Sequence, residues 1–178
     1  MVQTEGDCTI MDNLEKNTYV KNQIKQAMIN LLKEKEFTAI SISEITETAM
    51  VSRNSFYRNY SQKEDIIREY LLELLGEWTA DYDKQDSHSD DEFMVAMFHH
   101  MSNHKDFYMI LNERHLLYLL KNVFREIMGP KPEYPNIIAY SAAFIVSGIY
   151  GWVEEWLNRG MQESADEMAE LLKKRNSL

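Results

Sequence analysis

Hydrogen-bond donors are concentrated in the segment RNSFYRN, residues 53–59. Arginine and asparagine side chains can form paired hydrogen bonds with base edges, and hydroxyl, amide and ammonium groups commonly contact phosphates. The candidates for such contacts in and around this segment are Ser43, Arg53, Asn54, Ser55, Tyr57, Asn59 and Lys63. Their types and spacing favour a surface that binds nucleic acid. For any one of them, a solvated side chain is the alternative.

Three helix-start signals surround these donors. They are Ser41-x-x-Glu44, Ser52-x-x-Ser55 and Ser61-x-x-Glu64. The first and last have the capping-box form, in which serine accepts from a free backbone N–H and glutamate reaches back. The close spacing of the first two predicts a short helix, a tight turn and a polar second helix, which together form a helix-turn-helix. A small helical bundle with capped ends is the alternative.

Apolar residues at helical spacing support this interpretation. Ile24, Met28 and Leu31 give one apolar face to a helix expected over about residues 18–35. Phe56 and Tyr60 fall on one side of the polar second helix and are expected to face inward. The donors on the other side of that helix are therefore expected to face outward.

The ordered motifs resemble the DNA-binding domain of TetR-family transcriptional regulators. The residues that carry the resemblance are SISEI at 41–45, AMVS at 49–52, SFYRNY at 55–60 and SQKEDI at 61–66. The resemblance covers about residues 18–70. It implies an all-α protein with an N-terminal three-helix helix-turn-helix domain and a C-terminal helical domain for dimerisation and signalling.

Two positions depart from the family pattern. Met50 stands where the family usually has a turn glycine, and a positive φ there would strain a methionine. The sequence leaves open whether the turn is strained or built differently. Thr46 replaces a small alanine, which is a milder change.

The resemblance also implies a role for each donor. Arg53 and Asn54 match positions that contact bases, and Ser43 matches one that reaches a base or the backbone. The positions that match phosphate contacts are Ser55, Tyr57, Asn59 and Lys63.

Charge is distributed unevenly along the 178 residues, whose formal net charge is −10. Residues 14–68 carry nine Lys/Arg against seven Asp/Glu, whereas residues 69–178 carry ten against nineteen. The expected DNA reader is therefore mildly basic, and two copies would be needed for useful affinity. The sole cysteine, Cys8, excludes an intramolecular disulfide and a cysteine-rich zinc site. Residues 1–12 lack the pattern of a signal peptide, so we expect a cytoplasmic location.

We expect three regions: a flexible tail over residues 1–17, the helix-turn-helix domain over 18–64, and a helical dimerisation and ligand-binding domain over 65–178. Polar residues 79–91 separate the fourth helix from the next. Further helices are expected over about 90–103, 107–111, 114–128 and 135–159, with a last one capped by Ser164-x-x-Glu167.

Residues 137–153 are apolar almost all round the expected helix. The run is shorter than the roughly 20 residues that span a bilayer, and Glu154 and Glu155 close it without basic flanks. A helix that is apolar on every side is otherwise buried on every side, which in one small domain requires a partner. In the family, the last two long helices of each subunit form a four-helix dimer interface. The resemblance therefore implies a homodimer.

An effector site is less clearly marked. Met97, Met101, Phe107, Tyr108 and Tyr118 could line a pocket for an apolar small molecule, or belong to an ordinary core. His100 and His104 have a spacing that a metal ion could use, but structural or solvated histidines are commoner, so we expect no metal site and no cofactor. No catalytic arrangement stands out.

We therefore interpret the chain as a homodimeric transcriptional regulator, most simply a repressor, that binds a palindromic operator and receives a small-molecule or protein signal. The alternative is a protein of the same fold that acts mainly through a protein partner, with DNA binding secondary or lost. An enzyme is a distant third. The operator sequence, the effector and the direction of regulation are not encoded in any recognisable motif.

Overall fold

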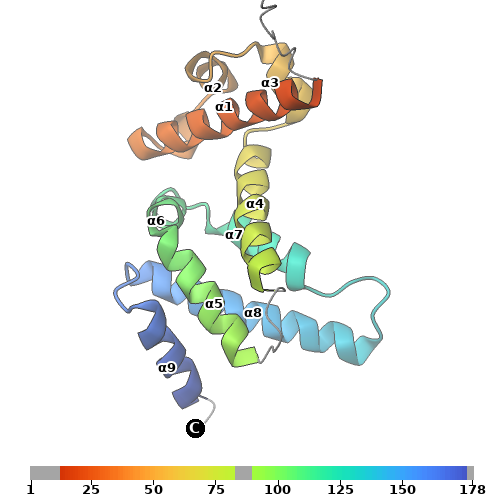
Figure 1. Ribbon diagram of the computed structural model, residues 1–178, viewed down its shortest axis with the longest axis vertical. Coiled ribbons are helices and arrows are strands. Elements are labelled where there is room, and N and C mark those ends of the chain that lie inside the picture. The colour runs from red at the N-terminus through yellow and green to blue at the C-terminus, as the bar shows by residue number, and fades with distance from the viewer. Residues whose placement is uncertain (1–12, 83–89, 176–178) are drawn as a thin grey trace, which may run out of the picture. The chain divides into compact units, whose positions relative to one another are not determined.

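The structure is a computed structural model that describes residues 13–82 and 90–175 (Figure 1). Every regular element in those two ranges is a helix, which confirms the expected all-α fold. The chain divides into two compact units, one ending at Lys63 and the other beginning at Glu64. We call them the N-terminal unit and the C-terminal unit.

Residues 13–63 of the N-terminal unit form three α-helices and one turn of 3-10 helix. They are α1 (Asn13–Glu34), η1 (Phe37–Ala39), α2 (Ile42–Thr48) and α3 (Arg53–Asn59). Since α1 already begins at Asn13, the expectation of a tail through residue 17 is wrong for residues 13–17, and residues 1–12 lie outside the described ranges. The core of this unit contains Ile24, Met28, Leu32, Ile45 and Phe56, all buried.

Serine caps begin α2 and α3, as the sequence predicts. The Ser41 hydroxyl accepts from the Glu44 backbone N–H at 3.2 Å, and the Ser52 hydroxyl accepts from the Ser55 N–H at 3.0 Å. Each cap satisfies one of the four N–H groups that a helix start leaves without a partner. The fourth helix signalled by Ser61-x-x-Glu64 is present, but α4 begins at Glu64, the last residue of that signal. In the turn between α3 and α4, the Lys63 side chain donates hydrogen bonds to the carbonyl groups of Phe37 and Ile40, at η1.

The turn between α2 and α3 keeps the geometry that usually calls for glycine. Met50 has φ of 54°, in the left-handed region, and its side chain is 92% exposed. The Met50 N–H donates to the Glu47 carbonyl at 3.1 Å and the Val51 N–H donates to the Thr46 carbonyl at 3.0 Å. This pair of bonds is a Schellman motif. The chain therefore retains the turn and accepts the strain of a methionine in it.

The described residues of the C-terminal unit form six helices, which Figure 1 labels. They are α4 (Glu64–Tyr82), α5 (Asp90–Asn103), α6 (Lys105–Glu113), α7 (Leu117–Met128), α8 (Asn136–Asn158) and α9 (Ala165–Arg175). The α9 helix packs along α5, and α7 packs against both α4 and α8. The expected linker at 79–91 is wrong for residues 79–82, where α4 continues. The cap expected at Ser89 lies outside the described residues.

Most helix ends of this unit follow the predicted signals. The α7 helix ends at Met128 before Gly129, where an added Cβ would lie 2.2 Å from the Arg125 carbonyl oxygen. Gly160, with φ of 78°, closes α8 in a second Schellman motif. The predicted box at the start of α9 is complete, because the Ser164 N–H donates to Glu167 at 2.8 Å and the Glu167 N–H donates to the Ser164 hydroxyl at 3.2 Å.

The α8 helix is buried on one side only. Val146, Tyr150 and Val153 pack into the unit, and the Phe144 side chain on another side is 81% exposed. Among the described helices, α8 is also the one long and apolar enough to cross a membrane, with a mean hydropathy of 1.4 and 17% of its most apolar window buried. Those properties are weak support for a membrane span, since they equally fit a helix that packs against a partner.

Candidate nucleic-acid interface

The α3 helix separates its apolar and polar residues on opposite faces. Phe56 is fully buried, and Tyr60, just beyond the helix, is almost so. Arg53, Asn54 and Tyr57 are exposed, as sequence reasoning predicted, with 59% of Tyr57 accessible. The inward anchors thus hold a row of donors outward, the arrangement in which a recognition helix presents side chains to a groove.

Arg58 belongs to the same outward face, although it was not among the predicted contacts. It is exposed and lies four residues after Asn54. Residues four apart on a helix are neighbours on its surface, so the face comprises two such pairs, Arg53 with Tyr57 and Asn54 with Arg58. Helical spacing was the signal that could have identified it. A second basic group on this face adds to its attraction for phosphate.

Ser43 and Arg53 are joined across the two short helices. The Arg53 guanidinium donates to the Ser43 hydroxyl. This bond connects the start of α2 to the start of α3, so two predicted contact residues lie together in the free protein. Four N–H groups of the guanidinium remain for other acceptors, since arginine has five.

Ser55 and Asn59 are partly engaged by α3 itself. The Ser55 and Ser52 hydroxyls lie 2.9 Å apart, and the Asn59 amide donates to the Ser55 carbonyl at 2.9 Å. Both side chains are half-buried. They therefore contribute to the cap and the last turn of α3, and the phosphate contacts assigned to them stay predictions.

Lys63 has a structural environment that the sequence did not suggest. Its ammonium donates to the Phe37 carbonyl at 2.5 Å and to the Ile40 carbonyl at 2.8 Å. It also lies 4.2 Å from the centre of the Phe37 ring. These contacts fasten η1 to the turn after α3 and use two of the three ammonium donors. The predicted phosphate contact of Lys63 stays a prediction, with at most one donor left for it.

The α2 helix is fixed by buried and paired polar groups. Thr46, only 3% exposed, donates its hydroxyl to the Ser43 carbonyl at 2.8 Å, so its burial leaves no unpaired hydroxyl. Lys35, just after α1, forms an ion pair with Glu44, and the hydrogen bond from Lys35 lowers the pKa of that carboxyl.

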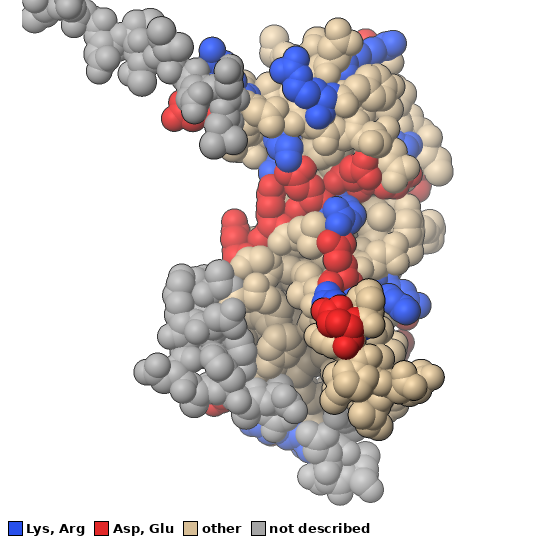
Figure 2. Space-filling view, turned by 90° about the vertical axis from the view of Figure 1, so that its right-hand side faces the viewer, with Lys and Arg blue, Asp and Glu red and all other residues tan. Residues whose placement is uncertain are grey.

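On the face drawn in Figure 2, basic side chains of this unit are separated by uncharged ones. The interface is therefore a pattern of specific donors on a weakly basic surface.

Four of the five predicted effector residues lie in the core of the C-terminal unit. Met97, Met101, Phe107 and Tyr108 are buried, whereas Tyr118 on α7 is 47% exposed. The Tyr108 hydroxyl is enclosed without a hydrogen-bond partner in the described protein, and burial raises the pKa of that group. Phe107 makes an edge contact with Tyr70 of α4, their ring centres 4.7 Å apart. The structure thus brings four residues into one interior and leaves Tyr118 at the surface.

His100 of α5 and His104, the residue just after that helix, lie together, with their ring centres 4.8 Å apart. Burial, and secondarily the neighbouring His104, lower the pKa of His100 from 6.5 to about 4. Within residues 13–82 and 90–175, no three His, Cys, Asp or Glu side chains gather as metal ligands would. His100 is accordingly neutral at pH 7.

Comparison with known proteins places these features in a family. A family model described as bacterial regulatory proteins of the tetR family matches residues 24–70, and one described as a transcriptional regulator C-terminal region matches residues 88–175. The chain is 26% identical over 149 residues to the uncharacterized HTH-type transcriptional regulator YxbF of Bacillus subtilis strain 168. That alignment covers 75% of this chain and 39% of the relative, so the chain spans about two-fifths of the relative's length.

Solved structures share the fold at low sequence identity. Lin0861 from Listeria innocua superimposes with a TM-score of 0.73 at 13% identity, covering 94% of each chain. A TetR transcriptional regulator from Streptococcus agalactiae 2603V gives 0.58 at 18% identity, covering 88% of this chain and 92% of that one. The dihydroxyacetone kinase operon activator DhaS gives 0.51 at 16% identity, covering 87% and 92%. Since the two family models together match most of the chain, it belongs to the TetR family of transcriptional regulators.

Proposed function

We propose that this regulator binds a palindromic operator as a homodimer and reads it with the outward face of α3. The observation that carries the proposal is the exposed row formed by Arg53, Asn54, Tyr57 and Arg58, held in place by the buried Phe56. Arg53 and Asn54 occupy the first turn of α3, the part of a recognition helix that contacts base edges. Ser43, bonded to Arg53, lies where it could reach a base or a phosphate.

A homodimer through α8 is part of the proposal. Apolar side chains of α8 that a single chain leaves exposed are Ile137, Ile138, Tyr140, Phe144 and Ile145. A Cβ added at Gly148 or Gly151 would meet nothing within 4 Å, so the backbone is open to close approach at these two positions. A large exposed apolar patch on a protein surface marks an interaction site. A second copy would bury this stripe and supply the second recognition helix.

Repression is the outcome that we propose, with activation as the alternative. Operator occupancy can block transcription without further contacts, whereas activation requires a productive contact with the transcription machinery. DhaS, whose fold is similar, is described as an operon activator. We also propose that the protein works on DNA in the cytoplasm, and that its chemistry is binding and not catalysis.

A small-molecule signal is supported by the unpaired Tyr108 hydroxyl. A buried hydroxyl without a partner costs about 1–3 kcal/mol, so a ligand that offers it an acceptor or donor gains affinity. Such a ligand would be largely apolar, because Met97, Met101 and Phe107 of the same unit are also buried apolar side chains. It changes operator affinity only if it binds one conformation of the dimer better than the other.

Regulation by a protein partner is the second candidate. The observation in its favour is the close packing of Met97, Met101, Phe107 and Tyr108, each at most 7% exposed. Residues 69–178 are also strongly acidic, with nineteen Asp/Glu against ten Lys/Arg. A partner with a basic surface could dock there without entering the interior.

Selection of genomic fragments by the purified protein, followed by sequencing, tests operator binding. We expect enriched fragments that share an inverted repeat. Retention of fragments at random, with no shared sequence, would leave the partner-mediated function as the better account. Comparing bound fragments at two salt concentrations separates specific binding from the phosphate contribution, because non-specific binding depends almost wholly on the latter.

A further inference from the structure

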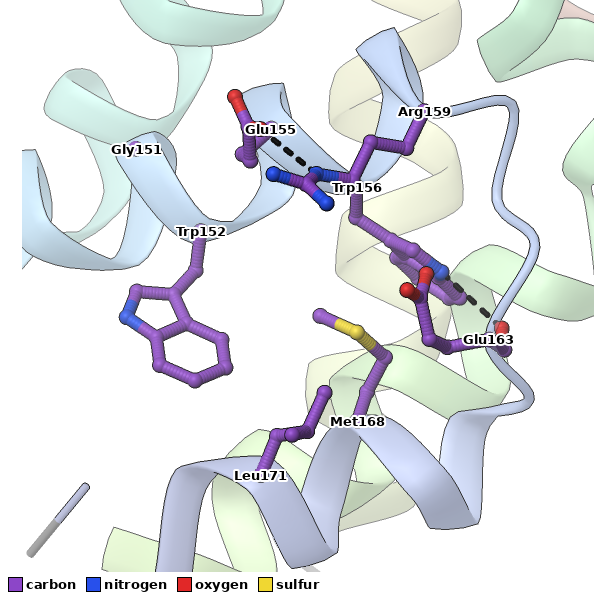
Figure 3. A pocket seen from close by; sticks show the side chains of 8 residues that line it. All are labelled: Gly151, Trp152, Glu155, Trp156, Arg159, Glu163, Met168 and Leu171. Carbon is purple, nitrogen blue, oxygen red and sulfur yellow. Dashed lines mark hydrogen bonds and ion pairs between the residues drawn. The ribbon is translucent and has the colours of Figure 1, made fainter. Parts of the chain in front are cut away.

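A pocket of about 300 Å³ lies between α8 and α9 (Figure 3). It is outside the interior that contains Tyr108 and outside the residues assigned to DNA. Its walls combine two indole rings, an ion pair and one further carboxylate.

The two tryptophans supply aromatic surface on opposite sides of the hollow. Trp156 is 2% exposed and its indole N–H donates to the Glu163 carbonyl at 3.0 Å. It also makes an edge contact with Phe98 of α5, so its position is fixed. Trp152 is half-buried, and Figure 3 shows its indole reaching toward Leu171 of α9. Indole faces attract cations more strongly than other aromatic side chains do.

The charge of the pocket is negative. Arg159 and Glu155 form an ion pair at 2.7 Å, and Glu155 is the chief cause of the raised pKa of that arginine. Glu163 contributes less to the same rise in pKa, so two carboxylates surround one guanidinium, and Figure 3 shows the Glu163 carboxylate beside the Trp156 ring. Its Oε2 atom is enclosed and has no hydrogen-bond partner in the described part of the chain. An enclosed carboxylate oxygen without a donor favours a positively charged group.

The loop that carries Glu163 is held at both ends. Gly160 closes α8 with a Schellman motif, and Ser164 caps α9 through the reciprocal bonds with Glu167. The bond from Trp156 to the Glu163 backbone fixes the middle. The carboxylate therefore stands in a preformed position, which lowers the entropic cost of binding.

We propose that this pocket binds a small organic cation, a protonated or quaternary amine that carries an apolar or aromatic group. The cation pairs with Glu163 while the apolar part lies between Trp152 and Trp156. An anion is repelled by the net negative charge, and a neutral molecule leaves Glu163 without a partner. The volume is at the lower end of the roughly 300–1,000 Å³ of small-molecule sites, so the ligand is small. The proposal does not depend on operator binding.

Titration of the full chain with benzyltrimethylammonium tests this assignment, followed by tryptophan fluorescence and by calorimetry. We expect saturable quenching. Glu163→Gln should weaken binding about tenfold, equivalent to about 1.4 kcal/mol. Glu155→Gln should also weaken it, because Arg159 then contributes an uncompensated positive charge. Benzyl alcohol and benzenesulfonate, which lack the positive charge, should bind more weakly than the cation.

Glu133→Gln, in the exposed segment before α8, is the matched control and should bind as the wild type does. Circular dichroism checks that each variant is folded. If Glu163→Gln does not fold, Glu155→Gln carries the comparison, since that side chain is 61% exposed. Absence of saturable binding overturns the proposal, and so does equal affinity of the wild type for the cation and benzyl alcohol. A partner subunit that fills the pocket would appear as absence of binding.

Discussion

At the residue scale, we expect the outward side chains of α3 to divide into those that contact bases and those that contact phosphates. Arg53 can make a bidentate contact with a base, which is worth about 1–3 kcal/mol of discrimination. Arg53→Ala should therefore relax preference at one operator position while affinity for unrelated DNA changes little. Competition binding against a set of single-base operator variants measures this. A uniform loss across all variants would assign Arg53 to the phosphates instead.

Tyr57 should behave differently from Arg53. Its hydroxyl is predicted to contact a phosphate, and its ring makes an edge contact with Phe56, their centres 5.4 Å apart. Tyr57→Phe keeps that ring contact and removes only the hydroxyl. We expect weaker binding to every sequence, by a similar factor, in an electrophoretic mobility assay. Unequal losses among operator variants would contradict a phosphate role.

Lys63 separates a structural role from a DNA contact. Lys63→Met removes the donor that serves the Phe37 and Ile40 carbonyls, and leaving polar groups without their partner costs about 1–3 kcal/mol. We expect a lower melting temperature in the absence of DNA, whereas the exposed Lys174→Met should melt as the wild type does. If Lys63 also neutralises a phosphate, the log–log salt slope flattens by about 0.9. An unchanged melting temperature would leave only the DNA role.

Met50 has a strained backbone conformation, with φ of 54°, in a turn whose hydrogen bonds are nevertheless complete. A left-handed backbone conformation costs a residue other than glycine about 1–2 kcal/mol. Replacing that residue by glycine removes this strain, but part of the gain is lost because glycine has more conformational freedom in the unfolded chain. Met50→Gly should therefore raise the free energy of unfolding by about 1 kcal/mol. Met50→Ala should change it little, because the methionine side chain is 92% exposed. Denaturant melts of the three proteins provide the comparison, and a destabilised glycine variant would show that the strain argument fails.

His100 gives the C-terminal unit a specific acid sensitivity. Its folded pKa of about 4 lies below the ordinary value of 6.5, so between those values the unfolded chain binds more protons. The stability contributed by neutral His100 is complete above pH 6.5 and is lost as the pH falls toward 4. His100→Leu should flatten this part of the stability profile, measured by thermal melts from pH 7 to 4. Parallel profiles for the two proteins would contradict the assigned burial of the neutral ring.

At the element scale, local sequence signals predicted where helices begin, but they did not predict the contacts between residues far apart in the chain. Ser41, Ser52 and Ser164 cap helices where the sequence indicated, because a cap depends on residues three positions apart. The bonds from Lys63 to the Phe37 and Ile40 carbonyls were not predicted, because they join residues more than 20 positions apart. Distant contacts of this kind leave no local pattern.

The candidate sites show the same division. The exposed face of α3 was predictable from the spacing of its polar residues, and Arg58 could have been added by the same rule. The pocket between α8 and α9 was not, because Trp156, Glu163 and Leu171 come together only through the turn at Gly160. The surface position of Tyr118 depends on the orientation of α7, which its sequence alone does not specify.

The exposed stripe of α8 leads to a prediction at the same scale. Phe144→Arg places a charge in the proposed interface between subunits, where burying it without a partner is strongly unfavourable. We expect monomers in sedimentation velocity at concentrations where the wild type is dimeric. Arginine at the small α8 positions Ala143 or Gly148 should have the same effect. Tyr19→Arg replaces a comparably exposed aromatic residue in the N-terminal unit and should leave the dimer intact. A wild type that sediments as a monomer would remove the basis of the palindromic operator.

At the scale of the whole molecule, the charge distribution favours the proposed homodimer. Residues 14–68 carry a net charge of only +2, and residues 69–178 carry −9, so general attraction to DNA is small. In the proposed homodimer, affinity comes from specific contacts made twice, by two α3 helices on one duplex. An acidic C-terminal unit also disfavours binding to unrelated DNA, which increases the ratio of specific to non-specific binding.

Hydroxyl-radical footprinting on a fragment selected from genomic DNA tests this account most directly. We predict two protected half-sites in inverted orientation, with centres about 10–10.5 base pairs apart or a multiple of that spacing. Arg53→Ala should weaken protection of both half-sites equally, because each half-site is contacted by α3 of one of the two identical subunits. A single protected site, or uniform cleavage at protein concentrations that saturate the selected fragment, would contradict operator binding by a homodimer.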